Sequence, residues 1–348
     1  MGKREFCAAA LAAALLTGCA GGGDGNGTTA TRAPSPVDAS AAAVLEDAYT
    51  RIVAAVLPSV VQINTDQGEG SGVVYDGDGH IVTNAHVVAG ARSLQVVPSS
   101  GGSPLNARLV GTFDAGDLAV VKVDGANLPP ASFGDSTRLK VGQIVLAMGS
   151  PLGLSGSVTN GIVSATGRTV TSQREGAFPG ATISDAVQTS AAINPGNSGG
   201  ALVTLDGTVV GIPTLAAGTG SGDLAAGIGF AIPGDTVRTI APQLISSGKV
   251  TSSGRAALNV TIAQTFSITT GKADGVAVVS AAEGGAAAAA GIRKGDVIVE
   301  VNGQATPTTT ALAEILANLQ VGQTVPVKVR REGKEQTFQV KLGELPGG

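Results

Sequence analysis

This sequence of 348 residues contains no tryptophan, and aromatic residues make up only 3% of it. Its core must therefore be built from Val, Ile, Leu and Ala rather than from large rings. Histidine is also scarce, because only His80 and His86 occur in the whole chain. A catalytic base of this type consequently has only two candidates.

An excess of positive charge is missing as well. The formal net charge is −4, and no run of basic residues occurs, which argues against a nucleic-acid partner. We find no Cys, His and acidic cluster with the spacing of a metal site. The glycine-rich stretches lack the strand, helix and lysine that accompany a phosphate-binding loop. We therefore expect no metal and no cofactor.

The two cysteines, Cys7 and Cys19, both lie near the start of the chain. Cys7 falls in an apolar stretch, residues 6–16, that is too short to span a bilayer and reads as a signal peptide. Leu16-Thr17-Gly18-Cys19 is typical of a bacterial lipoprotein signal, in which the cysteine is lipidated and becomes the new N-terminus. An ordinary cleaved signal is the alternative. We predict a signal peptide over residues 1–18, a membrane anchor at Cys19, an extracytoplasmic location and no internal disulfide.

Composition and periodicity then divide the chain. Residues 19–40 are rich in Gly, Thr, Ala, Pro and Ser and predict a flexible tether. A helix is expected over residues 41–57, and Asp235 is expected to cap a second helix over residues 236–245. Between them, short apolar runs separated by turns predict two antiparallel β-barrels. Their expected strands are residues 60–64, 72–75, 80–82, 94–97, 107–112 and 118–123, then 144–149, 156–162, 186–189, 201–205, 208–212 and 227–231.

The stretch QTSAAINPGNSGGALV, residues 188–203, places Ser198 in a tight turn that feeds a strand. Gly196 can adopt backbone angles closed to other residues, so the amides of Gly196 and Ser198, with Asn197 between them, can form a hole for an oxyanion beside the hydroxyl. The alternative is that these residues simply form a turn.

A reactive serine needs a base, and the base needs a carboxylate. His86 follows a strand-like run, whereas His80 follows the hairpin turn Asp76-Gly77-Asp78-Gly79, so we take His86 as the base. Asp117 directly precedes an alternating strand and is the expected carboxylate, while Asp114 is expected to be a solvated turn residue. The order His86, Asp117, Ser198 is the order found in chymotrypsin-like proteases.

Four blocks make this pattern specific: TNAHVV, DLAVVKV, NPGNSGGALV and GIGFAIP. In this order they resemble the signature blocks of the HtrA (DegP-like) serine proteases, from about Ser59 to the C-terminus. The resemblance implies a mainly β fold of trypsin-like barrels over residues 41–248. It also implies a homotrimer, and two loops over residues 169–182 and 215–226 that rearrange to switch the site on. We expect a site that rests partly inactive.

The resemblance also implies which residues recognise the substrate. Ile193, Ala216 and Ile228 would line the pocket for the residue before the scissile bond, and Thr214, Leu215 and Ala216 would pair with the substrate backbone. Such an apolar pocket implies cleavage after Val, Ala or Ile, with weak discrimination.

Residues 251–344 resemble an α+β PDZ domain, with GVAVV and GIRKGDVIVEVNG as its blocks. PDZ domains bind a peptide C-terminus as an added strand. The resemblance places the carboxylate loop at Leu258-Asn259-Val260, preceded by Ala257. Asn259 stands where the family usually has glycine, and asparagine tolerates the left-handed backbone angles required there.

The sequence therefore predicts an extracytoplasmic serine endopeptidase that degrades misfolded or unfolded proteins and is regulated by peptides at its PDZ domain. Two alternatives stay open. One is a non-catalytic chaperone or scaffold, and the other is a signalling protease dedicated to one membrane partner.

Overall fold

The computed structural model describes residues 39–125, 127–150, 156–172, 175–194, 196–218 and 224–347, without the side chains of Ala39, Ala41 and residues 215–218 and 224–226. The predicted signal peptide, Cys19 and nearly all of the predicted tether lie outside these residues. The chain divides after Val44, and residues Leu45–Gly348 form one unit. In the described part, none of the helices combines the length and apolar character that crossing a bilayer requires.

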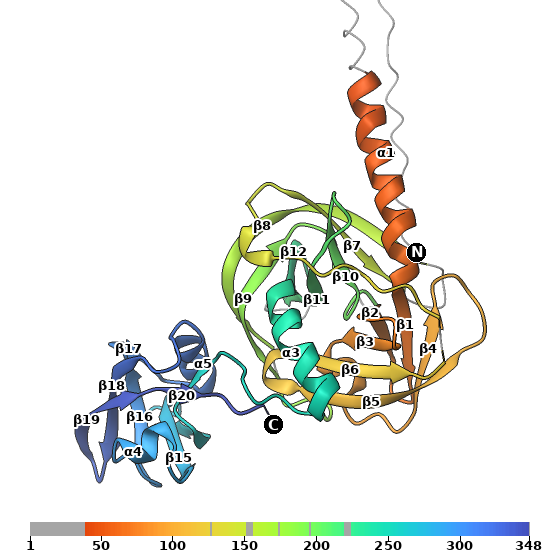
Figure 1. Ribbon diagram of the computed structural model, residues 1–348. Helices are drawn as coiled ribbons and strands as arrows, with labels where there is room; N and C mark the ends of the chain where they lie inside the picture. The colour runs from red at the N-terminus through yellow and green to blue at the C-terminus, as the bar shows by residue number, and fades with distance from the viewer. Residues whose placement is uncertain are drawn as a thin grey trace, which may run out of the picture. The chain divides into compact units, whose positions relative to one another are not determined.

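The first barrel is a closed antiparallel sheet in which each predicted strand is present. Its strands follow the order β1-β2-β3-β6-β5-β4, and β1 closes the barrel by pairing with β4, with Ile63 opposite Val96. Figure 1 shows this barrel in orange to yellow. The strands are β1 (Val60–Thr65), β2 (Glu69–Val74), β3 (His80–Thr83), β4 (Leu94–Pro98), β5 (Leu105–Phe113) and β6 (Leu118–Val123).

The second barrel is also closed, in the order β10-β11-β12-β9-β8-β7. Together the two barrels confirm the trypsin-like fold class expected from the sequence. The strands are β7 (Ile144–Gly149), β8 (Ser157–Thr171), β9 (Thr182–Thr189), β10 (Ala201–Thr204), β11 (Val209–Gly218) and β12 (Leu224–Pro233).

The two loops expected in this barrel are shorter than predicted. Residues 169–171 belong to β8, where Thr171 pairs with Thr182 of β9, and β11 continues to Gly218, which pairs with Leu224. Gly, Ser and Ala have little intrinsic preference for strands. Here pairing with the neighbouring strand makes β8 and β11 longer than their sequences predict. The loop predicted over residues 215–226 is therefore wrong in extent.

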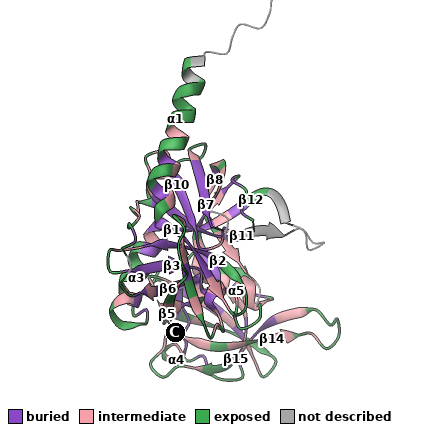
Figure 2. Cartoon of the chain, turned by 90° about the vertical axis from the view of Figure 1, so that its right-hand side faces the viewer, coloured by how far each residue is buried: buried purple, intermediate pink, exposed green. Residues whose placement is uncertain are grey.

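Aliphatic side chains fill the barrels, as the scarcity of aromatic residues required. Leu146 and Met148 of β7 join Val60 and Val82 in one cluster that contains residues of both barrels. Burial of each such side chain contributes about 1.5–3 kcal/mol. Figure 2 shows β1, β3, β7 and β10 as largely buried strands. This shared core fixes the seam at which side chains from the two barrels meet.

The expected helices are present. Helix α1 (Ala39–Val56) buries Ile52 and Val56, whereas Leu45 is 42% exposed. Helix α3 (Gly234–Ser247) lies along β5 and β6 (Figure 1) and buries one apolar stripe, namely Val237, Ile240, Ala241 and Leu244.

The predicted cap of α3 is wrong. The helix begins at Gly234, after Pro233, so Asp235 lies inside the first turn. Its Oδ2 atom accepts a hydrogen bond from Ser136 Oγ at 2.7 Å and another from Thr137 N at 3.1 Å. Asp235 therefore ties α3 to the connection between the barrels instead of capping its own helix.

The C-terminal region is the α+β sheet expected of a PDZ domain. Its strands follow the order β14-β15-β16-β18-β19, which leaves β14 at an edge, and helix α5 buries Leu312 and Ile315. A small sheet pairs β13 with β20. The elements are β13 (Ala256–Ala257), β14 (Val260–Phe266), β15 (Ala273–Ala281), α4 (Ala286–Ala289), β16 (Val297–Val301), β17 (Gln304–Ala305), α5 (Thr309–Ala317), β18 (Thr324–Arg331), β19 (Lys334–Lys341) and β20 (Gly343–Glu344).

Candidate active site

The structure brings His86 and Asp117 into direct contact. His86 lies on the short helix α2 (Ala85–Val88), and Asp117 lies between the 3₁₀ turn η2 (Asp114–Gly116) and β6. The carboxylate of Asp117 is 1% exposed. Its Oδ2 atom is 2.8 Å from His86 Nδ1, and its Oδ1 atom accepts from the His86 amide at 3.0 Å.

The backbone of Asp117 is left-handed, with a φ of 56°. A non-glycine residue rarely adopts this conformation, and here the Asp117 amide donates to Asp114 O at 3.1 Å to close the turn. Asn84 Nδ2 also donates to Asp117 O at 3.1 Å. These contacts hold the backbone of Asp117 in the conformation in which its carboxylate contacts His86. Because a carboxylate only accepts hydrogen bonds, the proton sits on Nδ1 and Nε2 is left to act as the base.

Thr214 of β11 supplies a further contact that the sequence did not reveal. Its hydroxyl donates a short hydrogen bond to Asp117 Oδ2, from a residue that is itself buried. The second barrel therefore helps to hold a carboxylate that belongs to the first. We expected Thr214 only as a backbone partner for substrate. A lone hydroxyl in the apolar run of β11 is the signal that could have suggested this role.

Replacing Thr214 by valine should keep the shape of the side chain and remove this donor. Because the Asp117 carboxylate is buried, we expect the free energy of unfolding to fall by about 1–3 kcal/mol. Denaturant unfolding of Thr214→Val beside Thr214→Ser, which keeps the hydroxyl, measures this. Equal stability of the two variants would show that the hydrogen bond contributes nothing.

The loop between β8 and β9 covers His86. The Phe178 ring is 3% exposed and meets the imidazole edge-on at 5.9 Å between centroids. Burial alone would lower the pKa of His86, but the hydrogen bond and charge of Asp117, with the charge of Glu175, raise that pKa above its ordinary value. Glu175 is exposed and lines the same cleft as His86. No motif in the sequence singles out Glu175.

Neutralising Glu175 should lower the pKa of His86, because a negative charge nearby favours the imidazolium. The base must be neutral, so the acid limb of kcat/KM should move to lower pH in Glu175→Gln. The shift should shrink in 1 M salt, where the screening length is about 3 Å. Glu283→Gln, at an exposed carboxylate of the PDZ region that does not line this cleft, is the control and should leave the limb in place. A shift in the opposite direction would contradict this role.

Ser198 lies in a turn that the first barrel holds in place. Ser71 of β2 is fully buried, its amide donates to Ser198 O at 2.8 Å, and its hydroxyl donates to Gly196 O at 2.5 Å. Gly199 has a φ of +83°, and a Cβ there would lie 2.1 Å from Ser71 O, so only glycine fits. The sequence does not predict this role of Ser71, because an isolated serine in a strand belongs to no motif that would indicate a contact with the Ser198 turn.

The amides near Ser198 differ in their availability. Gly196 is left-handed with a φ of +96°, and in the described part of the chain neither its amide nor that of Ser198 donates to a protein group. The Asn197 amide donates to Asn194 O at 3.0 Å, and Asn197 is 2% exposed. This amide is already bonded, so the donors left available beside Ser198 are the amides of Gly196 and Ser198, and the oxyanion hole of Gly196, Asn197 and Ser198 stays a prediction.

The hydroxyl of Ser198 has a backbone acceptor in β11. It donates to Thr214 O at 3.3 Å, and among the described residues no hydrogen bond joins it to His86. Ser198, His86, Gly196 and Glu175 nevertheless line one cleft of about 400 Å³. The three expected side chains therefore share a site, although the serine and the histidine are not bonded to each other.

The residues expected to contact substrate are only partly described. Ile193 is 7% exposed and packs against Gly229, where a Cβ would lie 2.4 Å from its Cγ1 atom. Ile228 is 38% exposed. The side chains of Leu215 and Ala216 lie outside the description, although Ala216 pairs with Gly229 in the β11–β12 register. The role of these residues in substrate selection stays a prediction.

Asn259 adopts the left-handed conformation expected of it, with a φ of 55°. Its side chain donates to Glu344 O of β20 at 2.9 Å. Leu258 is buried, and Asn259 and Val260 border a groove of about 700 Å³ between β14 and α5. The role of this loop in binding a carboxylate stays a prediction.

His80 takes no part in this site. Its Nδ1 atom is 2.7 Å from Asp76 Oδ2, and Asp76 Oδ1 accepts the amides of Asp78 and His80. The ligand atoms of these three residues lie within 4.8 Å of one another, but hydrogen bonds of the β2–β3 turn account for the arrangement.

Comparison with known proteins agrees with this fold. Residues 70–212 match the family model of a trypsin-like peptidase domain, and residues 258–342 match that of a PDZ domain. Serine protease PepD of Mycobacterium tuberculosis is 38% identical over 365 residues, which cover 96% of this chain and 77% of that protein.

Other relatives extend beyond the matched region or have solved structures. A probable periplasmic serine endoprotease DegP-like of Pseudomonas putida is 40% identical over 284 residues, 80% of this chain, and the match spans only 57% of its length. The solved structure of the HtrA-type protease AlgW with decapeptide has a TM-score of 0.57 at 31% identity, covering 86% of this chain and 99% of that one. The chain therefore belongs to the HtrA family of trypsin-like serine proteases.

Proposed function

We propose that this chain is a serine endopeptidase that hydrolyses unfolded or misfolded proteins outside the cytoplasm. The observation that carries the proposal is the buried Asp117 carboxylate bonded to His86 Nδ1 in the cleft that Ser198 also lines. The names of its relatives, serine protease PepD and periplasmic endoproteases of DegP type, support both the activity and the location.

The proposed reaction uses His86 as base and then as acid. His86 Nε2 takes the proton of Ser198 Oγ as the oxygen attacks the peptide carbonyl, and Asp117 stabilises the imidazolium. The amides of Gly196 and Ser198 bind the oxyanion, and each such donor contributes about 2.7–4 kcal/mol. His86 gives its proton to the leaving amine, and the acyl-enzyme on Ser198 is then hydrolysed by water that His86 activates.

We also propose that the site rests in a less active state. The supporting observation is that Ser198 Oγ donates to Thr214 O, and that among the described residues no hydrogen bond joins it to His86, so the hydroxyl must leave this acceptor before His86 takes its proton. Peptide C-termini are the proposed activators, bound at Leu258, Asn259 and Val260 as a strand added to β14, whose edge is free within the described sheet.

The remaining parts of the proposal concern organisation. We assign residues 1–18 to a lipoprotein signal, 19–40 to a tether, 41–248 to the protease domain and 251–344 to the PDZ domain. A lipid on Cys19 would hold the protein at the membrane, and a homotrimer is the proposed assembly. Metabolic labelling with a fatty acid, compared between the natural chain and Cys19→Ala, tests the anchor directly.

Digestion of an unfolded protein such as β-casein tests the activity. We expect cleavage after Val, Ala and Ile, because Ile193 and Ile228 are the apolar residues assigned to the pocket. A tightly folded protein at the same concentration is the control and should stay intact. Suppression of casein aggregation without any cleavage would favour the chaperone alternative. Rapid cleavage without an added peptide would contradict a signalling protease dedicated to one partner.

A further inference from the structure

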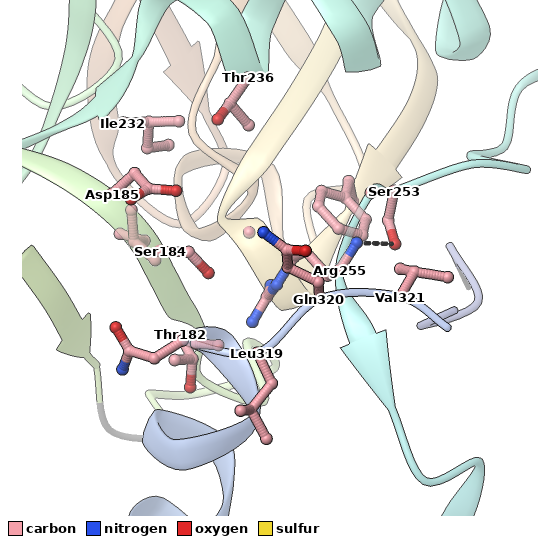
Figure 3. Close-up of a pocket in the computed structure, with 16 residues that line it drawn as sticks. Thr182, Ser184, Asp185, Ile232, Thr236, Ser253, Arg255, Leu319, Gln320 and Val321 are labelled. Carbon is pink, nitrogen blue, oxygen red and sulfur yellow. Dashed lines mark hydrogen bonds between the residues drawn. The ribbon is translucent and has the colours of Figure 1, made fainter. Parts of the chain in front are cut away.

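A second cavity lies away from the catalytic cleft and is lined by an arginine that has no counter-ion among the described residues. This Arg255 pocket has a volume of about 420 Å³, and Arg255, Ser184, Asp185, Thr236 and Gln320 are among its lining residues. Figure 3 shows Arg255 reaching from the segment of Ser253 toward the side of the pocket where Ser184 and Thr182 lie. Arg255, Thr182 and Ala317 line both this pocket and the peptide groove beside α5, whereas Ser184 and Asp185 line this pocket alone.

Two polar atoms at the pocket are buried without a hydrogen-bond partner among the described residues. They are Arg255 Nε and Ser184 Oγ. Arg255 uses Nη1 to donate to Ala115 O at 2.6 Å, and no carboxylate in the described part of the chain forms an ion pair with it. Burial lowers the pKa of Arg255 to about 10, so the guanidinium still carries its charge at neutral pH. Arg255 as a whole is half-buried, but a buried guanidinium nitrogen and a buried hydroxyl that lack partners both destabilise a folded protein.

The geometry points to a binding site for a small carboxylate in the Arg255 pocket. We propose that the two carboxylate oxygens accept in parallel from Arg255 Nε and from the remaining guanidinium nitrogen, Nη2, and that one of these oxygens also accepts from Ser184 Oγ. A planar guanidinium fork matches a carboxylate in this way. The Nη1 bond to Ala115 O need not break, because it uses a different edge of the group.

The size and the other charges of the pocket limit the ligand. A volume of about 420 Å³ lies within the range of small-molecule sites, about 300–1,000 Å³. Asp185 lines the same pocket and is exposed, so its charge opposes an anion. The ligand is therefore a small carboxylate or the carboxylate end of a short peptide. This inference does not depend on the proposed hydrolysis.

Succinate is a suitable probe, titrated into the full chain at constant ionic strength with sodium chloride as the balancing salt. We expect it to raise the thermal unfolding midpoint and to bind with a Kd that calorimetry can measure. Arg255→Lys keeps the charge but loses the fork and should weaken binding about tenfold. Asp185→Asn removes the opposing charge and should tighten binding.

Ser184→Ala separates binding from a purely structural role. Removing an unpaired buried hydroxyl should leave the unliganded protein equally stable or more stable, while succinate binding weakens about tenfold. Competition between succinate and a peptide with a free C-terminus, but not its amide, would identify a peptide end as the source. Failure of that peptide to compete would identify a free small carboxylate.

Three results would overturn the proposal. The first is a midpoint that rises equally with chloride alone, and the second is binding of inorganic phosphate without binding of succinate. The third is a succinate Kd that neither Arg255→Lys nor Ser184→Ala changes.

Discussion

Alanine in place of Ser198 is expected to lower kcat toward unfolded substrate by about 10⁶-fold, because the nucleophile and its base act as one unit. Stability should change little, since the hydroxyl makes only a 3.3 Å hydrogen bond to Thr214 O. Casein cleavage and thermal unfolding of Ser198→Ala beside the natural chain measure the two effects. Retention of even a hundredth of the natural rate by a pure sample of the variant would remove Ser198 from the reaction.

Replacing Asp117 by asparagine is expected to lower kcat by about 10⁴-fold with little change in KM. The amide cannot accept all the hydrogen bonds that the carboxylate accepts from His86 Nδ1, the His86 amide and Thr214 Oγ1. Its NH₂ group would instead favour the imidazole tautomer with the proton on Nε2, which cannot act as a base toward Ser198.

Asp114→Asn is the matched control for this variant. Asp114 begins the same 3₁₀ turn three residues earlier and is exposed, so the same chemical change there should leave kcat within about twofold. Equal losses in the two variants would mean that the turn, and not the carboxylate of Asp117, supports the reaction.

The sequence revealed the site because scarce or patterned residues carry it. Only one other histidine had to be considered as the catalytic base beside His86. Asp117 could be distinguished from Asp114 as the catalytic carboxylate because an alternating strand follows Asp117 directly. The structure places His86 and Asp117 in contact and leaves Asp114 in the exposed turn, as expected. Apolar alternation was also sufficient to predict the strands that close both barrels.

What the sequence could not reveal depends on contacts between residues far apart in the chain. Ser71 meets Gly196 across 125 positions, and Thr214 meets Asp117 across 97. Serine and threonine are common in strands, so neither stands out locally. The prediction that Asp235 caps its helix was wrong for the same reason. Its carboxylate accepts hydrogen bonds from Ser136 and Thr137, which lie far away in the sequence, in the connection between the barrels. Local patterns specify elements, whereas packing decides which polar groups become partners.

The most direct test of the account is the site of covalent labelling by a fluorophosphonate, which reacts with an activated serine. The natural chain should take up one label, and mass spectrometry should locate it at Ser198. Labelling should slow as the pH falls and His86 becomes protonated, and it should be lost in His86→Ala. A folded protein that is labelled at another serine, or at Ser198 equally fast without His86, would contradict the claim that these side chains form one catalytic site.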